Sequence, residues 1–339
     1  MPFSRLHAVC RRRLTLPLLK RFHPAVQTRV GPWTLRVDLR DDIIGYLLYT
    51  TGEYEAHVQR LFAAMELRDA TVIDVGANLG LHTLALRDCV GPRGRVIAFE
   101  PEPHNFALLT ENLRLNGPSP NVTTHRQAVG AAPGTCRLTL HPTNFGDHRV
   151  TNSAPEKNNS TTNHNSAYAD DCTGNHTAAN NSAHTVEVPI IRLDDTLAAI
   201  PAGAIQLIKI DVQGFEMSVL AGMTQTLARH PDALLLIEVF PEALRAAGSS
   251  GAALVTRLAE LGLTGWEFHE HRLLPVAPAW SYDLLEDGKD VNLILSRNAE
   301  KLRAVMTRWW GKPLPAPDGR AELRSASFPV QTSPLAPRE

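Results

Sequence analysis

Four short apolar runs, separated by segments of helical character, constrain the fold of this chain more than any other feature. They are TVIDVG from Thr71, RVIAFEP from Arg95, IQLIKID from Ile205 and ALLLIEVF from Ala233. Runs of this length without polar alternation are typical of strands buried on both faces of a parallel sheet. Strands that alternate with helices predict an α/β fold: a doubly wound, mostly parallel, seven-stranded sheet with an N-terminal cap.

The chain divides into three predicted regions. Residues 1–50 form the cap, which includes a basic arm, and residues 51–310 form the main α/β domain. Within that domain, residues 151–185 are rich in Asn, Ser, Thr and His and nearly lack large aliphatic side chains. Such a segment cannot bury enough apolar surface to offset its ordering entropy, so we predict a disordered insertion there and a disordered tail over residues 311–339.

Composition narrows the class of function. The formal net charge of -1 gives no electrostatic reason to expect nucleic acid as the main partner. No apolar run approaches the roughly 20 residues that a membrane-spanning helix needs. The four cysteines are scattered without a CxxC pair, which predicts neither a disulfide framework nor a zinc site. We therefore expect a cytoplasmic protein without a membrane span. The sequence leaves open whether it forms a homo-oligomer.

The segment after the first predicted strand indicates the cofactor. A dinucleotide site would need the pattern G-x-G-x-x-G, but here Asn78 stands where the second glycine is required. A negative charge at Asp74 suits a ligand with an ammonium and a sulfonium group better than a pyrophosphate, and S-adenosylmethionine is such a ligand. The candidate cofactor residues in this segment are Asp74, Gly76, Ala77, Asn78 and Gly80.

A second acid, Glu100, follows the next strand. Because a carboxylate at this place can accept hydrogen bonds from both hydroxyls of a ribose, we expect Glu100 to hold the adenosyl group. Pro101 fixes the turn away from the strand. Ala128 and Val129, at the exit of the third strand, are placed to form an apolar wall against the adenine. Two acids at the tips of neighbouring parallel strands thus predict one cofactor site.

The fourth strand ends with a charged pair, Lys209 and Asp211, whose side chains point to the same side because strand side chains alternate. Burial of two charged side chains there is costly unless they form an ion pair or take part in binding or catalysis. We expect Asp211 to lie beside the cofactor's methyl group and the acceptor hydroxyl; a purely structural Lys–Asp pair is the alternative. Glu238, at the end of the fifth strand, is a further candidate catalytic acid. The sequence requires no metal, although the two carboxylates could hold a divalent cation.

Polar residues also concentrate in NFGDHR, from Asn144 to Arg149. Asp147 could orient His148 as a general base for a hydroxyl. A turn in which Asp147 acts as a cap is an equally good interpretation.

Taken together, these motifs resemble the FkbM-type methyltransferases. The resemblance rests on GEYE before the first strand, VIDVGANLG with AFEP, NFGDHR, and VPIIRLDDTL…LIKIDVQGFEMSVLAG…LLIEVFPE, and it covers about residues 40–297 without the insertion. It implies a class I, Rossmann-like methyltransferase fold, S-adenosylmethionine as the methyl donor, and O-methylation of sugars, polysaccharides or secondary metabolites. The residues that match the family's motifs are Asp74, Gly76, Asn78, Gly80, Glu100, Asp211 and Glu216. Gln213 stands where the family commonly has Glu, and the insertion also departs from its pattern.

The sequence therefore predicts an S-adenosylmethionine-dependent O-methyltransferase with a small-molecule or glycan acceptor. Positioning of the reactants and exclusion of water are its main tasks, and Asp211 or His148 is the candidate base. Two alternatives stay open: an NAD-type oxidoreductase on the same fold, and a catalytically silent S-adenosylmethionine-binding module. Base methylation is not expected, because no Asp/Asn-Pro-Pro-aromatic loop follows Asp211.

Overall fold

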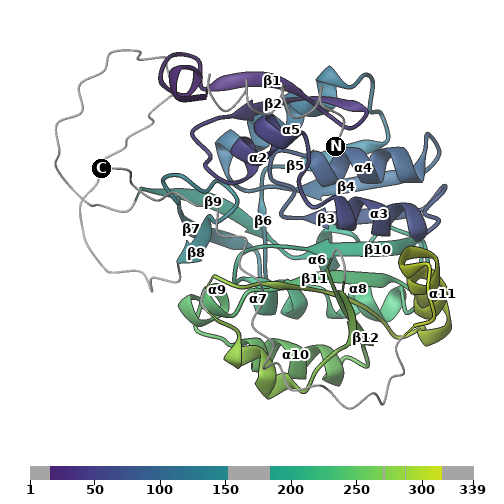
Figure 1. The fold of residues 1–339 in the computed structure, drawn as a ribbon. Helices are drawn as coiled ribbons and strands as arrows, with labels where there is room; N and C mark the ends of the chain where they lie inside the picture. Colours follow the sequence, from purple (N-terminus) through teal and green to yellow (C-terminus); the bar gives the residue numbers. More distant parts are fainter. Residues whose placement is uncertain (1–15, 152–183, 270–271, 287, 315–339) are drawn as a thin grey trace.

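A large mixed sheet forms the centre of the molecule. The computed structural model describes residues 16–151, 184–269, 272–286 and 288–314. In this part of the chain the largest sheet has eight strands, in the order β13-β12-β14-β11-β10-β3-β4-β5 (Figure 1). Their bounds are β3 Thr71–Val75, β4 Arg95–Phe99, β5 Val122–His125, β10 Ile205–Ile210, β11 Leu234–Val239, β12 Thr264–His269, β13 Arg272–Pro275 and β14 Val291–Ser296.

The five strands from β5 to β11 in that order are parallel to one another, and β14 runs antiparallel to β11 and β12. The predicted doubly wound, mostly parallel fold is confirmed. The predicted number of seven strands is one short, because the run WEFHEHRLL is not a single strand. It supplies two antiparallel strands, β12 and β13, and β13 adds an eighth strand at the edge.

Helices cover both faces of the sheet, because strand side chains alternate between two apolar cores (Figure 1). On one face, Val72 and Leu207 pack in the same core as helices α3, α4, α5 and α11. On the other face, Ile73 and Ile208 pack with α7, α8 and α10. The bounds are α3 Ala56–Ala64, α4 Leu81–Val90, α5 Pro103–Leu115, α7 Glu216–Ala221, α8 Thr224–Arg229, α10 Gly251–Glu260 and α11 Ala299–Trp310.

The region before the sheet contains an antiparallel hairpin, β1 (Ala25–Val30) with β2 (Trp33–Asp38), followed by α2 (Ile44–Thr51). Two asparagines one turn apart, one on α5 and one directly after its last residue, hold the outer edge of β2. The side-chain amide of Asn112 bonds the backbone N–H and C=O of Arg36, and that of Asn116 does the same for Thr34. These side chains therefore take the place of a further strand.

A second, four-stranded sheet has the order β6-β9-β7-β8, with β6 Ala128–Val129, β7 Gly134–Thr139, β8 Arg149–Thr151 and β9 Thr185–Ile191. The expected third strand is thus divided between two sheets, as β5 and β6. Short helices α6 (Leu193–Thr196) and α9 (Pro241–Ala246) and the 3-10 helix η1 (Ala279–Leu284) complete the elements.

The segments for which disorder is predicted lie largely outside the described residues. Of the insertion, Thr151 ends β8 and Thr185 begins β9, while residues 152–183 are not described. Residues 1–15 of the basic arm and residues 315–339 of the tail are likewise outside. Among the helices that the structure does describe, none is both long enough and apolar enough to cross a membrane.

Candidate active site

A cavity with about 990 Å³ of empty space, counting the part open to solvent, lies at the carboxyl ends of the parallel strands. This is the edge of an open α/β sheet where ligands bind. Most of the sequence-predicted site residues line it: Gly76, Ala77, Asn78, Glu100, Pro101, Ala128, Val129, His148, Asp211 and Glu238. Two predicted residues, Asp74 and Gly80, are not in its lining.

The turn after β3 passes very close to the chain that leaves β10. Gly76 has φ +81°, and a Cβ atom there would lie 1.8 Å from the carbonyl oxygen of Asp211. Only glycine fits at this position. The backbone N–H groups of Gly76 and Ala77 both donate to the carbonyl oxygen of Phe99, at 3.0 Å. The turn is thus fixed to both neighbouring strands.

The side chain of Glu100 holds the next part of this turn. Its Oε2 accepts a hydrogen bond from the backbone N–H of Asn78 at 2.8 Å, and its Oε1 accepts one from the N–H of Glu102 at 2.9 Å. Burial raises the pKa of Glu100 to about 8. A carboxylate offers about four lone-pair sites, and a protonated carboxyl adds an O–H donor to the acceptor sites that remain. In either state Glu100 can form further hydrogen bonds with a ligand in the cavity that it lines.

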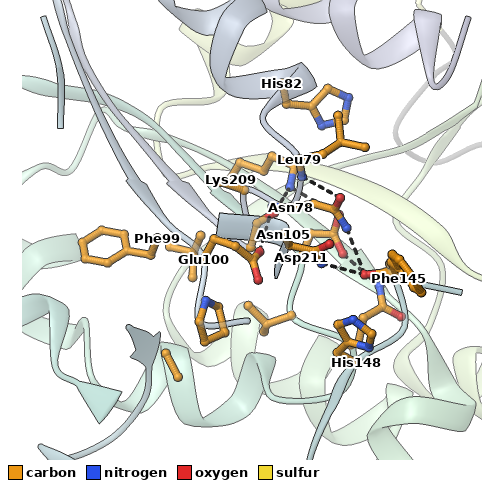
Figure 2. A pocket seen from close by; sticks show the side chains of 18 of the residues that line it. Asn78, Leu79, His82, Phe99, Glu100, Asn105, Phe145, His148, Lys209 and Asp211 are labelled. Carbon is orange, nitrogen blue, oxygen red and sulfur yellow. Dashed lines mark hydrogen bonds and ion pairs between the residues drawn. The ribbon is translucent and has the colours of Figure 1, made fainter. Parts of the chain in front are cut away.

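The loop around Phe145 forms another wall of the cavity. The side-chain amides of Asn78 and Asn105 converge on the carbonyl oxygen of Phe145, at 3.2 and 2.8 Å (Figure 2). On the cap side, the backbone N–H of Asp42 donates to Thr143 at 2.7 Å. The loop is therefore tied to α5 and to the cap at once. Asn105 also lines the cavity, and no sequence motif marked it.

His148 reaches the cavity from the same loop, but the predicted partnership with Asp147 is wrong. The carboxylate of Asp147 pairs with Arg149 at 2.5 and 2.9 Å. The Nδ1 of His148 instead accepts a hydrogen bond from the backbone N–H of His141 at 3.0 Å. Burial lowers the pKa of His148. The neutral ring therefore carries its proton on Nε2, which makes it a hydrogen-bond donor rather than a proton acceptor.

The structure places Asp74 beneath the cavity. Its side chain is fully buried, accepts a hydrogen bond from Thr83 Oγ1 at 2.6 Å, and lies 3.6 Å from Lys209 Nζ. Asp74 therefore does not line the cavity, contrary to its predicted contact with the cofactor; its carboxylate faces Lys209 instead. Gly80 also acts in packing, because a Cβ atom there would lie 2.6 Å from Leu109 Cδ1 on α5.

Lys209 links the buried acid to the cavity. Its ammonium group lies 3.3 Å from Asp211 Oδ2 and 3.3 Å from the carbonyl oxygen of Gly76. Although burial favours its neutral form, Asp211 and Asp74 raise the pKa of Lys209. Burial likewise acts to raise the pKa of Asp211, but the neighbouring ammonium and Gln213 hold it below its usual value. Asp211 is therefore an anion in the cavity wall.

Gln213 connects the two acids at the ends of β10 and β11. Its Nε2 donates to Asp211 Oδ1 at 2.9 Å and to Glu238 Oε2 at 2.7 Å. Burial and the Asp211 charge raise the pKa of Glu238 well above its usual value. An amide suits this position because it donates to both carboxyl groups, whereas an ionised Glu would repel them. Among the described residues, no group of three or more His, Cys, Asp or Glu side chains is arranged to hold a metal ion.

Three cavity residues without an assigned role in the sequence interpretation are Tyr54, Glu55 and His82. Tyr54 and Glu55 belong to the GEYE segment, which served in the sequence analysis only as one of the motifs that resemble the FkbM family. Glu55 lies in the left-handed region at φ +46°, as do Asn78 and Gln213. Non-glycine residues in that region cluster at functional sites.

The family model described as Methyltransferase FkbM domain matches residues 74–269, which is more than half of the chain. The chain belongs to the FkbM methyltransferase family. Its parallel strands, the turn at Gly76 and the acid at Glu100 are the class I, Rossmann-like features that the resemblance implied.

Individual FkbM relatives match a shorter part. "Methyltransferase 1" of Beauveria bassiana is 31% identical over 165 residues, covering 46% of this chain and 59% of the relative. "31-O-demethyl-FK506 methyltransferase FkbM" of Streptomyces tacrolimicus is 32% identical over 163 residues, covering 47% and 62%. The chain spans about three fifths of the length of these curated relatives. A solved FkbM methyltransferase of Methylobacillus flagellatus KT has a TM-score of 0.40 and 15% identity, covering 85% of this chain and 59% of that one.

Proposed function

We propose that this FkbM-family chain is an S-adenosylmethionine-dependent O-methyltransferase. Its acceptor would be a hydroxyl of a sugar, polysaccharide or secondary metabolite, and not a nucleic acid. The observation that carries the proposal is that Glu100 and Asp211, from the strands on either side of β3, line one cavity around the Gly76 turn. The name of the Streptomyces relative specifies a 31-O-demethyl substrate, which supports oxygen as the acceptor atom.

The lining of the cavity fits this cofactor chemically. Glu100 has free acceptor sites for ribose hydroxyls, and Ala128 and Val129 supply an apolar wall for the adenine. Asp211, held as an anion, suits the cationic methionine end. The lining contains four carboxyl side chains and one ammonium group, that of Lys209, in the described residues. Lys209 is already held by Asp211 and by the carbonyl oxygen of Gly76, so this described lining offers no unpaired cation to a pyrophosphate and the NAD-type alternative is less well supported.

S-adenosylmethionine supplies, when bound, a methyl group that its sulfonium makes electrophilic. The chain's own residues then have to orient the acceptor and exclude water. We propose that Asp211 accepts a hydrogen bond from a second hydroxyl of the acceptor, beside the reacting oxygen, and that His148 Nε2–H and the carboxyl group of Glu238 form hydrogen bonds with other hydroxyl groups of the acceptor. A polyhydroxylated acceptor would match these donors and acceptors.

Two measurements test the proposal in sequence. Calorimetry with S-adenosylhomocysteine and with NAD should give heat of binding for the first ligand alone. A labelled-methyl transfer assay over a panel of hydroxyl compounds should then give methylated product. Binding of NAD alone would support the oxidoreductase instead. Tight S-adenosylhomocysteine binding without transfer to any hydroxyl compound would support the catalytically silent module.

A further inference from the structure

Glu55 and His82 form a pair in the cavity wall that the proposed function does not yet use. Glu55 immediately precedes α3, and His82 lies in the first turn of α4, 3.5 Å away between Oε2 and Nε2. The His82 side chain is 9% exposed and that of Glu55 is 20% exposed. Both line the cavity, and Nε2 of His82 makes no hydrogen bond within the described part of the chain. A buried ring nitrogen without a partner is costly, which points to a partner that joins the pair from the cavity.

The surroundings of this pair keep a proton on Glu55 and leave His82 neutral. The titratable groups that interact with one or both members, from every element packed against them, are Tyr54, His57, Lys209, Asp211, Glu238 and Asp290. Burial and the Asp211 charge raise the pKa of Glu55 to about 8, although Lys209 opposes this. Burial, with the Lys209 charge, lowers the pKa of His82 to about 3. At neutral pH the carboxyl therefore holds a proton that it can release and regain.

The other candidate bases in the cavity are poorly suited to take up a proton. Asp211 is held anionic by Lys209 and Gln213, so its basicity is low. Nδ1 of His148 already accepts a backbone N–H. Burial and the Asp211 charge raise the pKa of Glu238 well above its usual value, and its Oε2 already accepts a hydrogen bond from Gln213. A general base works best with a pKa near the working pH, and Glu55 meets that condition.

We propose that Glu55 takes up the proton of the acceptor hydroxyl and that His82 positions its carboxyl group, a role that rests on the methyl transfer proposed above. The hydroxyl oxygen bonds to the methyl carbon while its proton passes to a carboxylate oxygen of Glu55. The electron pair of the broken carbon–sulfur bond stays on sulfur. Because the Glu55 side chain is not fully enclosed, the proton then leaves to solvent.

The central experiment compares Glu55→Gln with Glu53→Gln, an exposed acid in the same segment. With an acceptor found in the hydroxyl panel, kcat/KM of the unchanged protein should rise with pH through about 8 and then level off, since protonated Glu55 cannot accept a proton. Glu55→Gln should lower kcat by roughly 10²- to 10⁴-fold and abolish this rise. Glu53→Gln should match the unchanged protein, and all three should bind S-adenosylhomocysteine equally well.

A second readout needs no cofactor or acceptor. In protein labelled with ¹³C at the glutamate carboxyl groups, the Glu55 resonance is the one that is missing from the spectrum of Glu55→Gln. In the unchanged protein this resonance should titrate near pH 8. In His82→Asn that resonance should titrate at a different pH, and the pH–rate profile should move with it. A purely structural role of His82 would leave both midpoints in place. Titration of Glu55 near its ordinary value of about 4.3 would overturn the proposal.

The outcomes separate the two proposals. If the unchanged protein fails to bind S-adenosylhomocysteine or to transfer a methyl group, the proposed function fails, while the NMR titration still tests the state of Glu55. If methyl transfer is found but Glu55→Gln keeps the rate and pH profile of Glu53→Gln, only the role of Glu55 is refuted.

Discussion

Replacement of Lys209 by Met tests whether the buried charges beneath the cavity hold the site together. The substitution keeps most of the side-chain volume but removes the ammonium group from Asp74 at 3.6 Å and from Asp211 at 3.3 Å. Asp74 is fully buried and keeps only Thr83 as a partner. Removal of one member of a buried ion pair typically costs about 3–5 kcal/mol, because the other charge is left uncompensated.

Protonation of Asp74 sets an upper limit to that cost. A carboxyl group with an ordinary pKa of 3.8 can be protonated at pH 7 for about 4 kcal/mol and at pH 5 for less than about 2 kcal/mol. In the Lys209→Met variant the folded state therefore binds a proton that the unfolded state does not. Its stability falls as pH rises above the ordinary pKa of the acid. Because burial already raises the pKa of Asp74 in the unchanged protein, we expect a loss of up to about 4 kcal/mol at pH 7 and less than half of that at pH 5.

Urea unfolding at 25 °C and at both pH values measures this loss, with the exposed Lys312→Met as the matched control. Lys209→Met combined with Asp74→Asn should recover part of the lost stability, because no buried charge is left at position 74. A loss below about 1 kcal/mol at pH 7, or a larger loss at pH 5 than at pH 7, would refute the assigned role of Lys209.

Two further substitutions test the cofactor side of the cavity. Glu100→Gln should weaken S-adenosylhomocysteine binding by about 10- to 100-fold in calorimetry at pH 9, where Glu100 is ionised, because hydrogen bonds that involve a carboxylate contribute about 1.5–3 kcal/mol; unchanged affinity would contradict its role at the ribose. Gly76→Ala should lower the thermal midpoint much more than Gly203→Ala does. Both glycines have positive φ, at +81° and +76°, but only at position 76 would a Cβ atom meet backbone, at 1.8 Å from Asp211 O. Equal shifts would mean that the close approach of the two chain segments does not matter.

The sequence alone determined the central strands of this protein and the edge of the sheet at which its candidate site lies. Burial patterns of strands and helices are local, so the runs that became β3, β4, β10 and β11 were visible without any knowledge of their neighbours. Because parallel strands present their carboxyl ends at one edge, Asp74, Glu100 and Asp211 were expected at one site; Glu100 and Asp211 line one cavity, whereas Asp74 lies outside its lining.

Which side chains reach that cavity was decided by tertiary structure. Asp74 and Lys209 are register partners on adjacent strands, and that pairing, between residues 135 positions apart, covers Asp74 with an ammonium group. The pairing of Glu55 with His82 depends on how α3 packs beside α4. Contacts of this kind arise from the register and packing of segments that are distant in the sequence. The local residue pattern of one segment does not say which other segment it will pack against.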